Sequence, residues 1–125
     1  MAKIMIVDDS VVMRKNLKAL LTQGNHTVVY EASNGFQAYN EYADHMPDVV
    51  TMDITMPGIN GIDAVKKIIK DFPSAKIIMI SALDQRNMVF DALKNGAKHY
   101  IIKPVTAEKI NSVIDRIMNN EDLSE

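Results

Sequence analysis

The sequence has no cysteine, and its 125 residues contain no long apolar run. The lack of cysteine excludes disulfides and thiol chemistry. The apolar stretch near the N-terminus, residues 4–7, is too short for a signal-peptide core, and nothing approaches the roughly 20 residues that cross a bilayer. We therefore expect a cytoplasmic protein without a membrane segment.

The chain also lacks a strong charge of either sign. Its 14 Lys and Arg face 16 Asp and Glu, a net charge of -2, so no electropositive field drives direct binding to nucleic acid or to an anionic membrane. With 47% hydrophobic residues, the composition is that of a globular protein. We expect one domain over residues 1–120, a polar C-terminal tail over 121–125, and a monomer.

Short runs rich in β-branched residues recur at regular intervals. Their apolar residues are continuous rather than alternating, which is typical of strands buried on both faces of a parallel sheet. The predicted strands are residues 4–7, 28–32, 49–52, 77–80 and 100–102.

The segments between these runs carry helical spacing of apolar residues. The clearest sets are Met13, Leu17, Leu20 and Leu21; Val65, Ile68, Ile69 and Phe72; and Ile110, Val113, Ile114 and Ile117. Fainter helices are expected after Gly35 and from about Asp84, with Gly24 and Gly96 at helix C-termini and Thr106 as an N-cap. Right-handed crossovers then favour an α/β fold, a (βα)₅ doubly wound parallel five-stranded sheet.

Polar side chains gather at the carboxyl ends of the predicted strands, where open α/β sheets form their sites. The residues that follow strands one, three, four and five are Asp8, Asp9 and Ser10; Asp53; Ser81 and Ala82; and Lys103 and Pro104. A lone Asp at such a position is usually a helix cap and a lone Lys is usually solvated. Suitable groups at four strand ends together indicate a site.

Clustered carboxylates raise one another's pKa unless a cation offsets their charge. Oxygen ligands favour a hard ion, and we predict Mg²⁺, with Mn²⁺ as a substitute. His26, His45 and His99 are scattered, and we interpret them as surface residues. A carboxylate beside Mg²⁺ and a lysine can attack phosphorus, which predicts an aspartyl phosphate on Asp53.

Four motifs together resemble the receiver domain of two-component response regulators. They are Asp8-Asp9, the stretch from Asp53 to Gly61, Ser81-Ala82 and Lys103-Pro104. The resemblance covers essentially the whole chain and is strongest to stand-alone chemotaxis receivers. It implies a flavodoxin-like fold with strand order 2-1-3-4-5.

The resemblance also implies residue roles. Asp53 would accept a phosphoryl group from a sensor histidine kinase, Asp9 would bind the metal directly, Asp8 mainly through water, and the Thr55 backbone carbonyl would be a third ligand. Lys103 would pair with the phosphoryl group, and the Lys103-Pro104 peptide bond would be cis, a rare state even before proline.

Signal output is a further implication of the family. Ser81 and Tyr100 match its switch pair beside the phosphoryl group, and the readout would lie on the fourth helix, fifth strand and fifth helix. The implied donor is a CheA-like kinase, and the implied output partner is the flagellar motor switch. Thr55 and Leu83 match positions that tune phosphoryl lifetime. Neither offers an acid or amide to orient an attacking water, so we predict self-dephosphorylation slower than in relatives with polar residues at both positions.

Other functions remain open at this point. A haloacid-dehalogenase-like phosphohydrolase would need an acid two residues after Asp53, where Thr55 stands. A flavodoxin-like electron carrier would bind phosphate where Asp8 and Asp9 would repel it. Within the receiver family, the alternatives are a phosphorelay intermediate or the receiver of a longer transcription factor, although the chain's end just after its last helix favours a free-standing protein. We expect no enzymatic activity beyond phosphorylation and dephosphorylation of the chain itself.

Overall fold

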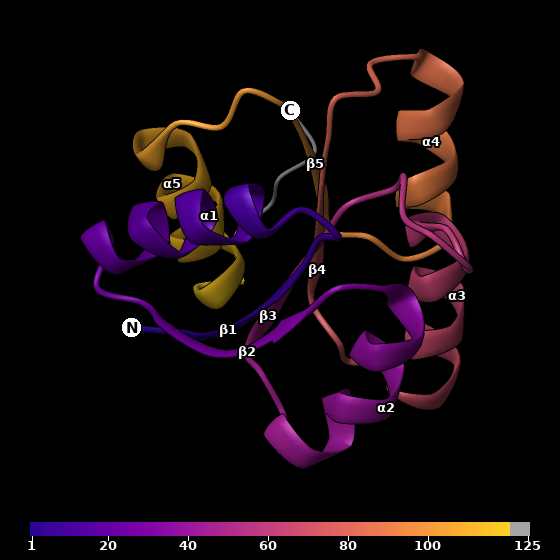
Figure 1. Cartoon of the computed structure of the whole chain (residues 1–125), viewed down its shortest axis with the longest axis horizontal. Coiled ribbons are helices and arrows are strands. Elements are labelled where there is room, and N and C mark those ends of the chain that lie inside the picture. Colours follow the sequence, from indigo (N-terminus) through magenta and orange to yellow (C-terminus); the bar gives the residue numbers. More distant parts are fainter. Residues whose placement is uncertain (121–125) are drawn as a thin grey trace.

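The computed structural model describes residues 1–120 as strands and helices in strict alternation (Figure 1). The elements are β1 (Lys3–Val7), α1 (Val11–Gln23), β2 (Thr27–Ala32), α2 (Gly35–His45), β3 (Val49–Met52), α3 (Gly61–Asp71), β4 (Ile77–Ser81), α4 (Arg86–Lys94), β5 (His99–Ile102) and α5 (Ala107–Met118). The predicted tail, 121–125, lies outside the described residues. Within the described part, no helix is both long and apolar enough to cross a membrane.

The five strands form one parallel sheet in the order β2-β1-β3-β4-β5. This confirms the predicted doubly wound topology and the flavodoxin-like order. Every residue of the central strands β3 and β4 is buried. The expectation of burial on both faces is wrong for the two edge strands. β2 has mostly half-buried or exposed residues, and Ile101 is the one buried residue of β5.

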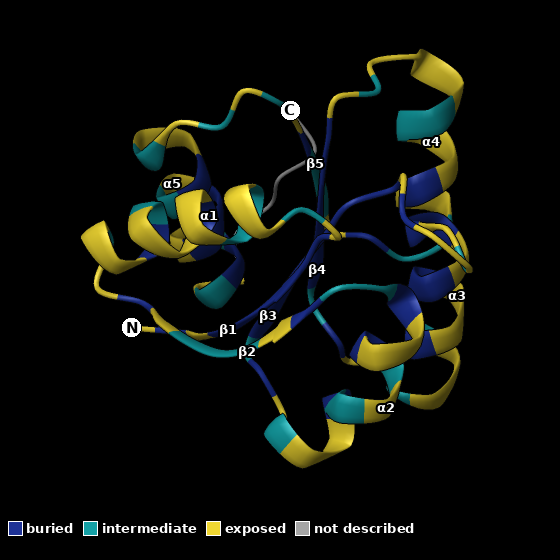
Figure 2. Ribbon diagram, viewed as in Figure 1, coloured by how far each residue is buried: buried dark blue, intermediate teal, exposed yellow. Residues whose placement is uncertain are grey.

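Helices cover both faces of the sheet. Figure 1 shows α1 and α5 on one side and α2, α3 and α4 on the other. Each face has its own apolar cluster, and the helices turn their exposed residues outward in Figure 2. Met5, Met52 and Met79 are fully buried, so these methionines are core residues.

Polar caps begin four of the five helices. Side-chain oxygens of Ser10, Asn34, Asn60 and Thr106 accept hydrogen bonds from backbone N–H groups in the first turns, which confirms the predicted Thr106 cap. Helix α4 starts after Gln85, whose side chain makes no cap hydrogen bond. Its first turn is therefore the least secured of the five.

Glycine 61 lets α3 begin directly against the end of β3. A Cβ atom there would lie 2.0 Å from the backbone oxygen of Asp53, and backbone cannot move aside as a flexible side chain would. The Gly61 N–H donates to the Ile54 oxygen at 2.8 Å. The close approach keeps the loop after Asp53 compact and holds it at the edge of the sheet where the acidic residues lie.

The interpretation of His26 as a surface residue is wrong. Its exposed fraction is 5%, and its Nδ1 accepts a hydrogen bond from the Ala2 N–H at 3.0 Å. Its Nε2 lies 3.5 Å from Oδ1 of Asp115 on α5. Burial follows from contacts with two segments distant in sequence, which no local pattern around His26 reveals.

Candidate functional site

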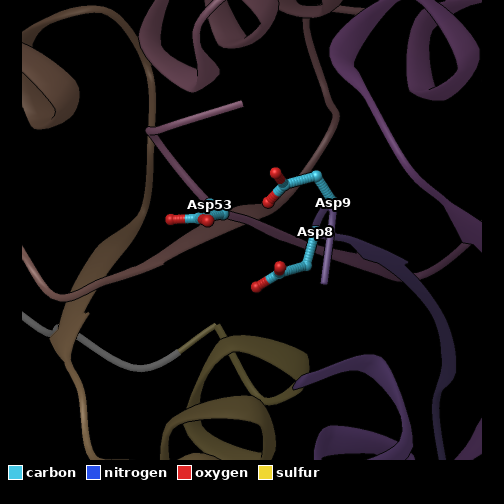
Figure 3. Close-up of side chains that lie close together, drawn as sticks. All are labelled: Asp8, Asp9 and Asp53. Atoms are coloured by element: carbon cyan, nitrogen blue, oxygen red, sulfur yellow. The ribbon is translucent and has the colours of Figure 1, made fainter. Parts of the chain in front are cut away.

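Three carboxylates meet at the carboxyl edge of the sheet. Asp8 and Asp9 follow β1 and Asp53 follows β3, and one ligand oxygen from each lies within 4.8 Å of the others. Figure 3 shows the three side chains lying close together. Adjacency of β1 and β3 in the sheet brings together acids that are more than forty residues apart.

Backbone hydrogen bonds extend the sheet pairing into this site. The Asp8 N–H donates to the Ala32 oxygen and the Asp53 N–H to the Val7 oxygen, both at 3.0 Å. The side chains are also held: Oδ1 of Asp8 accepts from the Ser10 N–H at 2.9 Å, and Oδ1 of Asp53 accepts from the Ile54 N–H at 2.8 Å. The positions of the two buried carboxylates are thus set by rigid elements.

Lysine 103 reaches the same site from the end of β5. Its Nζ lies 3.3 Å from Oδ2 of Asp8 and 3.7 Å from Oδ2 of Asp53. The backbone N–H of Lys103 donates to the backbone carbonyl oxygen of Ser81 at 2.9 Å, and the peptide bond from Lys103 to Pro104 is cis. The ammonium group therefore lies between a carboxylate from β1 and one from β3.

The electrostatics of the site leave Asp53 under-compensated. Burial raises the pKa of Asp53 most; Lys103 opposes the rise, and the carboxylates of Asp8 and Asp9 add to it. A cation bound beside these carboxylates would offset the negative charge of Asp8 and Asp9 and so favour the ionised form of Asp53. The donor set, three carboxylates and no soft ligand, fits a small hard dication such as Mg²⁺.

Leu83 connects the two residues matched to the switch pair. Its N–H donates to Oγ of buried Ser81 at 3.2 Å, and its carbonyl oxygen accepts from the Tyr100 hydroxyl at 2.7 Å. Burial raises the pKa of Tyr100, and a hydrogen bond with Ser81 opposes that rise. One peptide segment of the β4–α4 loop thus bonds to both Ser81 and Tyr100.

The remaining candidate residues lie around this centre. Thr55 and Ala82 are exposed in the loops after β3 and β4, and the metal-binding role of the Thr55 carbonyl stays a prediction. Leu83 is half-buried and packs against the core cluster of its face. Sequence reasoning missed Arg14, whose Nη1 donates to the Asp8 carbonyl oxygen at 2.6 Å; its only local signal is a position six residues after Asp8.

Comparison with known proteins identifies the family. The sequence pattern of the family described as response regulator receiver domain matches residues 4–115. The chain belongs to the response regulator receiver family. Receiver domains are phosphoacceptor signalling modules rather than enzymes in the usual sense, and they bind Mg²⁺ at an acidic pocket. The assignment selects the receiver interpretation over the phosphohydrolase and the electron carrier.

Curated receivers with a chemotaxis name are similar over nearly their full length. The chemotaxis protein CheY of Thermotoga maritima is 45% identical over 115 residues, which cover 92% of this receiver and 96% of that protein. For CheY of Bacillus subtilis the identity is 46% over 117 residues, or 94% and 98% of the two chains.

A solved structure of a complex shows the same fold. The CheX–CheY–BeF₃–Mg²⁺ complex from Borrelia burgdorferi matches this receiver with a TM-score of 0.85 and 38% identity, covering 94% of this chain and 87% of that one. That complex contains Mg²⁺ and a beryllofluoride group by its description.

Proposed function

We propose that this receiver accepts a phosphoryl group on Asp53 from a histidine kinase and thereby switches the binding of an output protein. The observation that carries the proposal is the position of Asp53. Its carboxylate lies beside Asp8 and Asp9 and 3.7 Å from the Lys103 ammonium. A nucleophilic carboxylate, a metal-binding acidic pair and a cation are thus within reach of one phosphoryl group.

The chemistry requires little from the protein beyond position and charge. An oxygen of Asp53 bonds to phosphorus while the bond between phosphorus and the donor histidine nitrogen breaks. The electron pair of that bond stays on the nitrogen, and the donor ring, already protonated on its other nitrogen, leaves as neutral imidazole. Lys103 would pair with a phosphoryl oxygen. When bound by Asp9 and Asp53, with Asp8 acting through water and the Thr55 carbonyl as a further ligand, Mg²⁺ (or Mn²⁺) would offset charge on the phosphoryl oxygens.

The link from Asp53 to the surface runs through Ser81, Leu83 and Tyr100. A phosphoryl group that draws the Ser81 hydroxyl toward itself would weaken the bond from the Leu83 N–H, and Leu83 also supplies the acceptor for Tyr100. The phosphoryl group can shift the equilibrium only by interacting better with one arrangement. Ala82 lies in the same loop and would follow its movement.

The output surface would be formed by α4, β5 and α5. Three large apolar side chains on α4 and β5 are exposed: Phe90, Leu93 and Ile102. Exposed apolar side chains on these elements could contribute contacts to a protein partner. The similarity to CheY proteins supports a role in chemotaxis. In that role, the donor would be a CheA-like kinase and the partner the flagellar motor switch, as the family resemblance of the sequence implies.

Phosphorylation at Asp53 can be tested with acetyl phosphate as donor in the presence of Mg²⁺. We expect the intact mass to rise by one phosphoryl group in the wild type and in Asp63→Asn, an exposed control on α3, but not in Asp53→Asn. Labelling of Asp53→Asn to the wild-type extent would refute the assignment. Loss of labelling in EDTA would support the metal requirement.

Coupling to the output surface can be tested with beryllofluoride as phosphoryl mimic. Pull-down from a lysate, with and without beryllofluoride, would identify an output protein whose affinity we expect to increase. Tyr100→Ala should reduce this increase while leaving Asp53 phosphorylation intact. If Tyr100→Ala left the affinity and its dependence on beryllofluoride unchanged, Tyr100 would not be part of the switch.

A further inference from the structure

Arginine 14 of α1 makes two polar contacts that join helix, strand and acidic site. Its Nη1 donates to the Asp8 carbonyl oxygen at 2.6 Å, and its Nε lies 3.3 Å from Oε1 of Glu31 on β2. The exposed fraction of the Arg14 side chain is 16%, against 57% for Lys18, which approaches the same Glu31 at 3.9 Å. Arg14 is therefore held between two partners, whereas Lys18 is mainly in solvent.

Both sides of the Asp8 main chain are tied to β2. The Asp8 N–H donates to the backbone oxygen of Ala32. The Asp8 carbonyl oxygen accepts a hydrogen bond from Arg14, which in turn pairs with Glu31, the residue before Ala32 on β2. The C=O of Asp8 and the N–H of Asp9 belong to one planar peptide unit. A bond that fixes this plane fixes where the Asp9 Cα lies and leaves rotation about its N–Cα bond as the remaining freedom between the plane and the Asp9 side chain.

We propose that Arg14, held in place by Glu31, is a positioning residue that orients the Asp8–Asp9 peptide and so sets the two carboxylates for a divalent cation. The inference rests on the proposed function, since it concerns the same metal site. Arg14 acts here through geometry rather than charge, because Glu31 neutralises its guanidinium and its contact with Asp8 is to a carbonyl, not a carboxylate. A planar guanidinium can serve both partners at once.

Geometry and charge predict opposite effects of removing Arg14. If Arg14 acted only as a nearby positive charge, Arg14→Gln would reduce repulsion and strengthen Mg²⁺ binding. If it positions the peptide, Arg14→Gln should weaken Mg²⁺ binding about tenfold, the low end of what removal of an outer hydrogen-bond partner costs a metal site. Arg14→Lys should weaken it similarly, because a compact ammonium cannot bridge Asp8 and Glu31.

The test is calorimetric titration of each metal-free protein with MgCl₂ and no phosphoryl donor. Lys18→Gln is the matched control. Like Arg14→Gln, it removes one positive charge from α1 that approaches Glu31, but no hydrogen bond joins Lys18 to the Asp8 carbonyl. We therefore expect Lys18→Gln to bind Mg²⁺ with wild-type affinity. Glu31→Gln, which leaves Arg14 untethered, should give an intermediate loss and serves as the second variant if Arg14→Gln folds poorly. Thermal unfolding in EDTA establishes that each protein titrated is folded.

A second readout does not involve the metal. In metal-free protein, the amide ¹⁵N shift of Asp9 reports the hydrogen bond on the adjoining Asp8 carbonyl and should change in Arg14→Gln and Arg14→Lys but not in Lys18→Gln. If Arg14→Gln bound Mg²⁺ as tightly as the wild type or more tightly, the positioning role of Arg14 would be overturned, and the proposed metal site would stand. A wild-type protein that binds no Mg²⁺ would overturn the proposed metal site and this role of Arg14 with it.

Discussion

At the scale of single residues, the three site aspartates differ in their surroundings. Asp8 has partners for its N–H, its C=O and both carboxylate oxygens. Asp53 is buried, and its pKa is raised. Asp9 is exposed. The same side chain thus suits different proposed roles: Asp8 is fully bonded, Asp53 is sheltered as the proposed nucleophile would be, and Asp9 is accessible from solvent.

Leu83 allows a prediction about phosphoryl lifetime. Its side chain packs against the core and offers no group that could orient an attacking water. We expect Leu83→Glu to speed loss of the phosphoryl group severalfold, because a carboxylate can act as a general base toward water. The measurement is phosphate release after the donor has been removed.

The matched control for this prediction is Leu83→Met, which keeps an apolar side chain of similar volume and should retain the wild-type rate. Urea unfolding of both variants separates an effect on the chemistry from loss of packing. Equal rates in Leu83→Glu and the wild type would remove Leu83 from the control of lifetime.

At the scale of elements, α4 is the least anchored helix in the described part of the chain. Its start lacks the side-chain cap that the other four helices have, and Ala92 is its one buried residue, against four in α5. A helix with few buried contacts opens at low free energy. This helix packs against β5, the strand that carries Tyr100, in the proposed output surface, so ease of movement there suits a switch.

The missing cap of α4 can be supplied by Gln85→Ser. The backbone of Gln85 is already extended, with φ -64° and ψ 134°, as an N-cap requires. We expect about 1 kcal/mol of added stability in urea unfolding and slower amide exchange in α4. Tighter anchoring should also reduce the response of partner binding to beryllofluoride.

Helix α5 provides the opposite control. Its Thr106 cap accepts from the Lys109 N–H at 3.1 Å, so Thr106→Ala should cost about 1 kcal/mol. If Gln85→Ser left both stability and α4 exchange unchanged while Thr106→Ala lowered stability, the absent cap would not be what makes α4 weak.

At the scale of the whole molecule, His26 connects three segments at the amino ends of the strands, the edge of the sheet opposite the acidic site. Its ring links the start of β1, the turn after α1 and Asp115 of α5. Because Nδ1 accepts from the Ala2 N–H, the ring must be neutral in this arrangement. Burial lowers the pKa of His26, against the opposing effect of Asp115, while the N-terminal amine adds to the lowering.

This geometry predicts a loss of stability in mild acid. A histidine with a lowered folded-state pKa stays neutral in the folded protein while the unfolded chain takes up protons, so stability is full above pH 6.5, its ordinary pKa, and falls as the pH drops below it. His26→Gln, whose side-chain oxygen can accept from Ala2, should be less stable at neutral pH but lose less on acidification. Urea unfolding at a series of pH values checks this, and parallel curves for the two proteins would contradict it.

Much of this protein is determined by its sequence alone. Continuous apolar runs specify central strands, helical spacing specifies the layers between them, and residues such as Asp8, Asp53 and Lys103 follow strands directly, so a parallel sheet must bring them to one edge. Strand order did not follow from periodicity; it came from the family resemblance and was confirmed by the structure.

Only the tertiary structure decided which partners these residues meet. The exposure of β2, the burial of His26, the contact of Arg14 with Asp8 and Glu31, and the two bonds of Leu83 all depend on segments brought together by packing. Local patterns record whether a residue suits a helix, strand or turn, because those preferences act over a few neighbours. The direction of a side chain toward a distant segment depends on the completed sheet and helices.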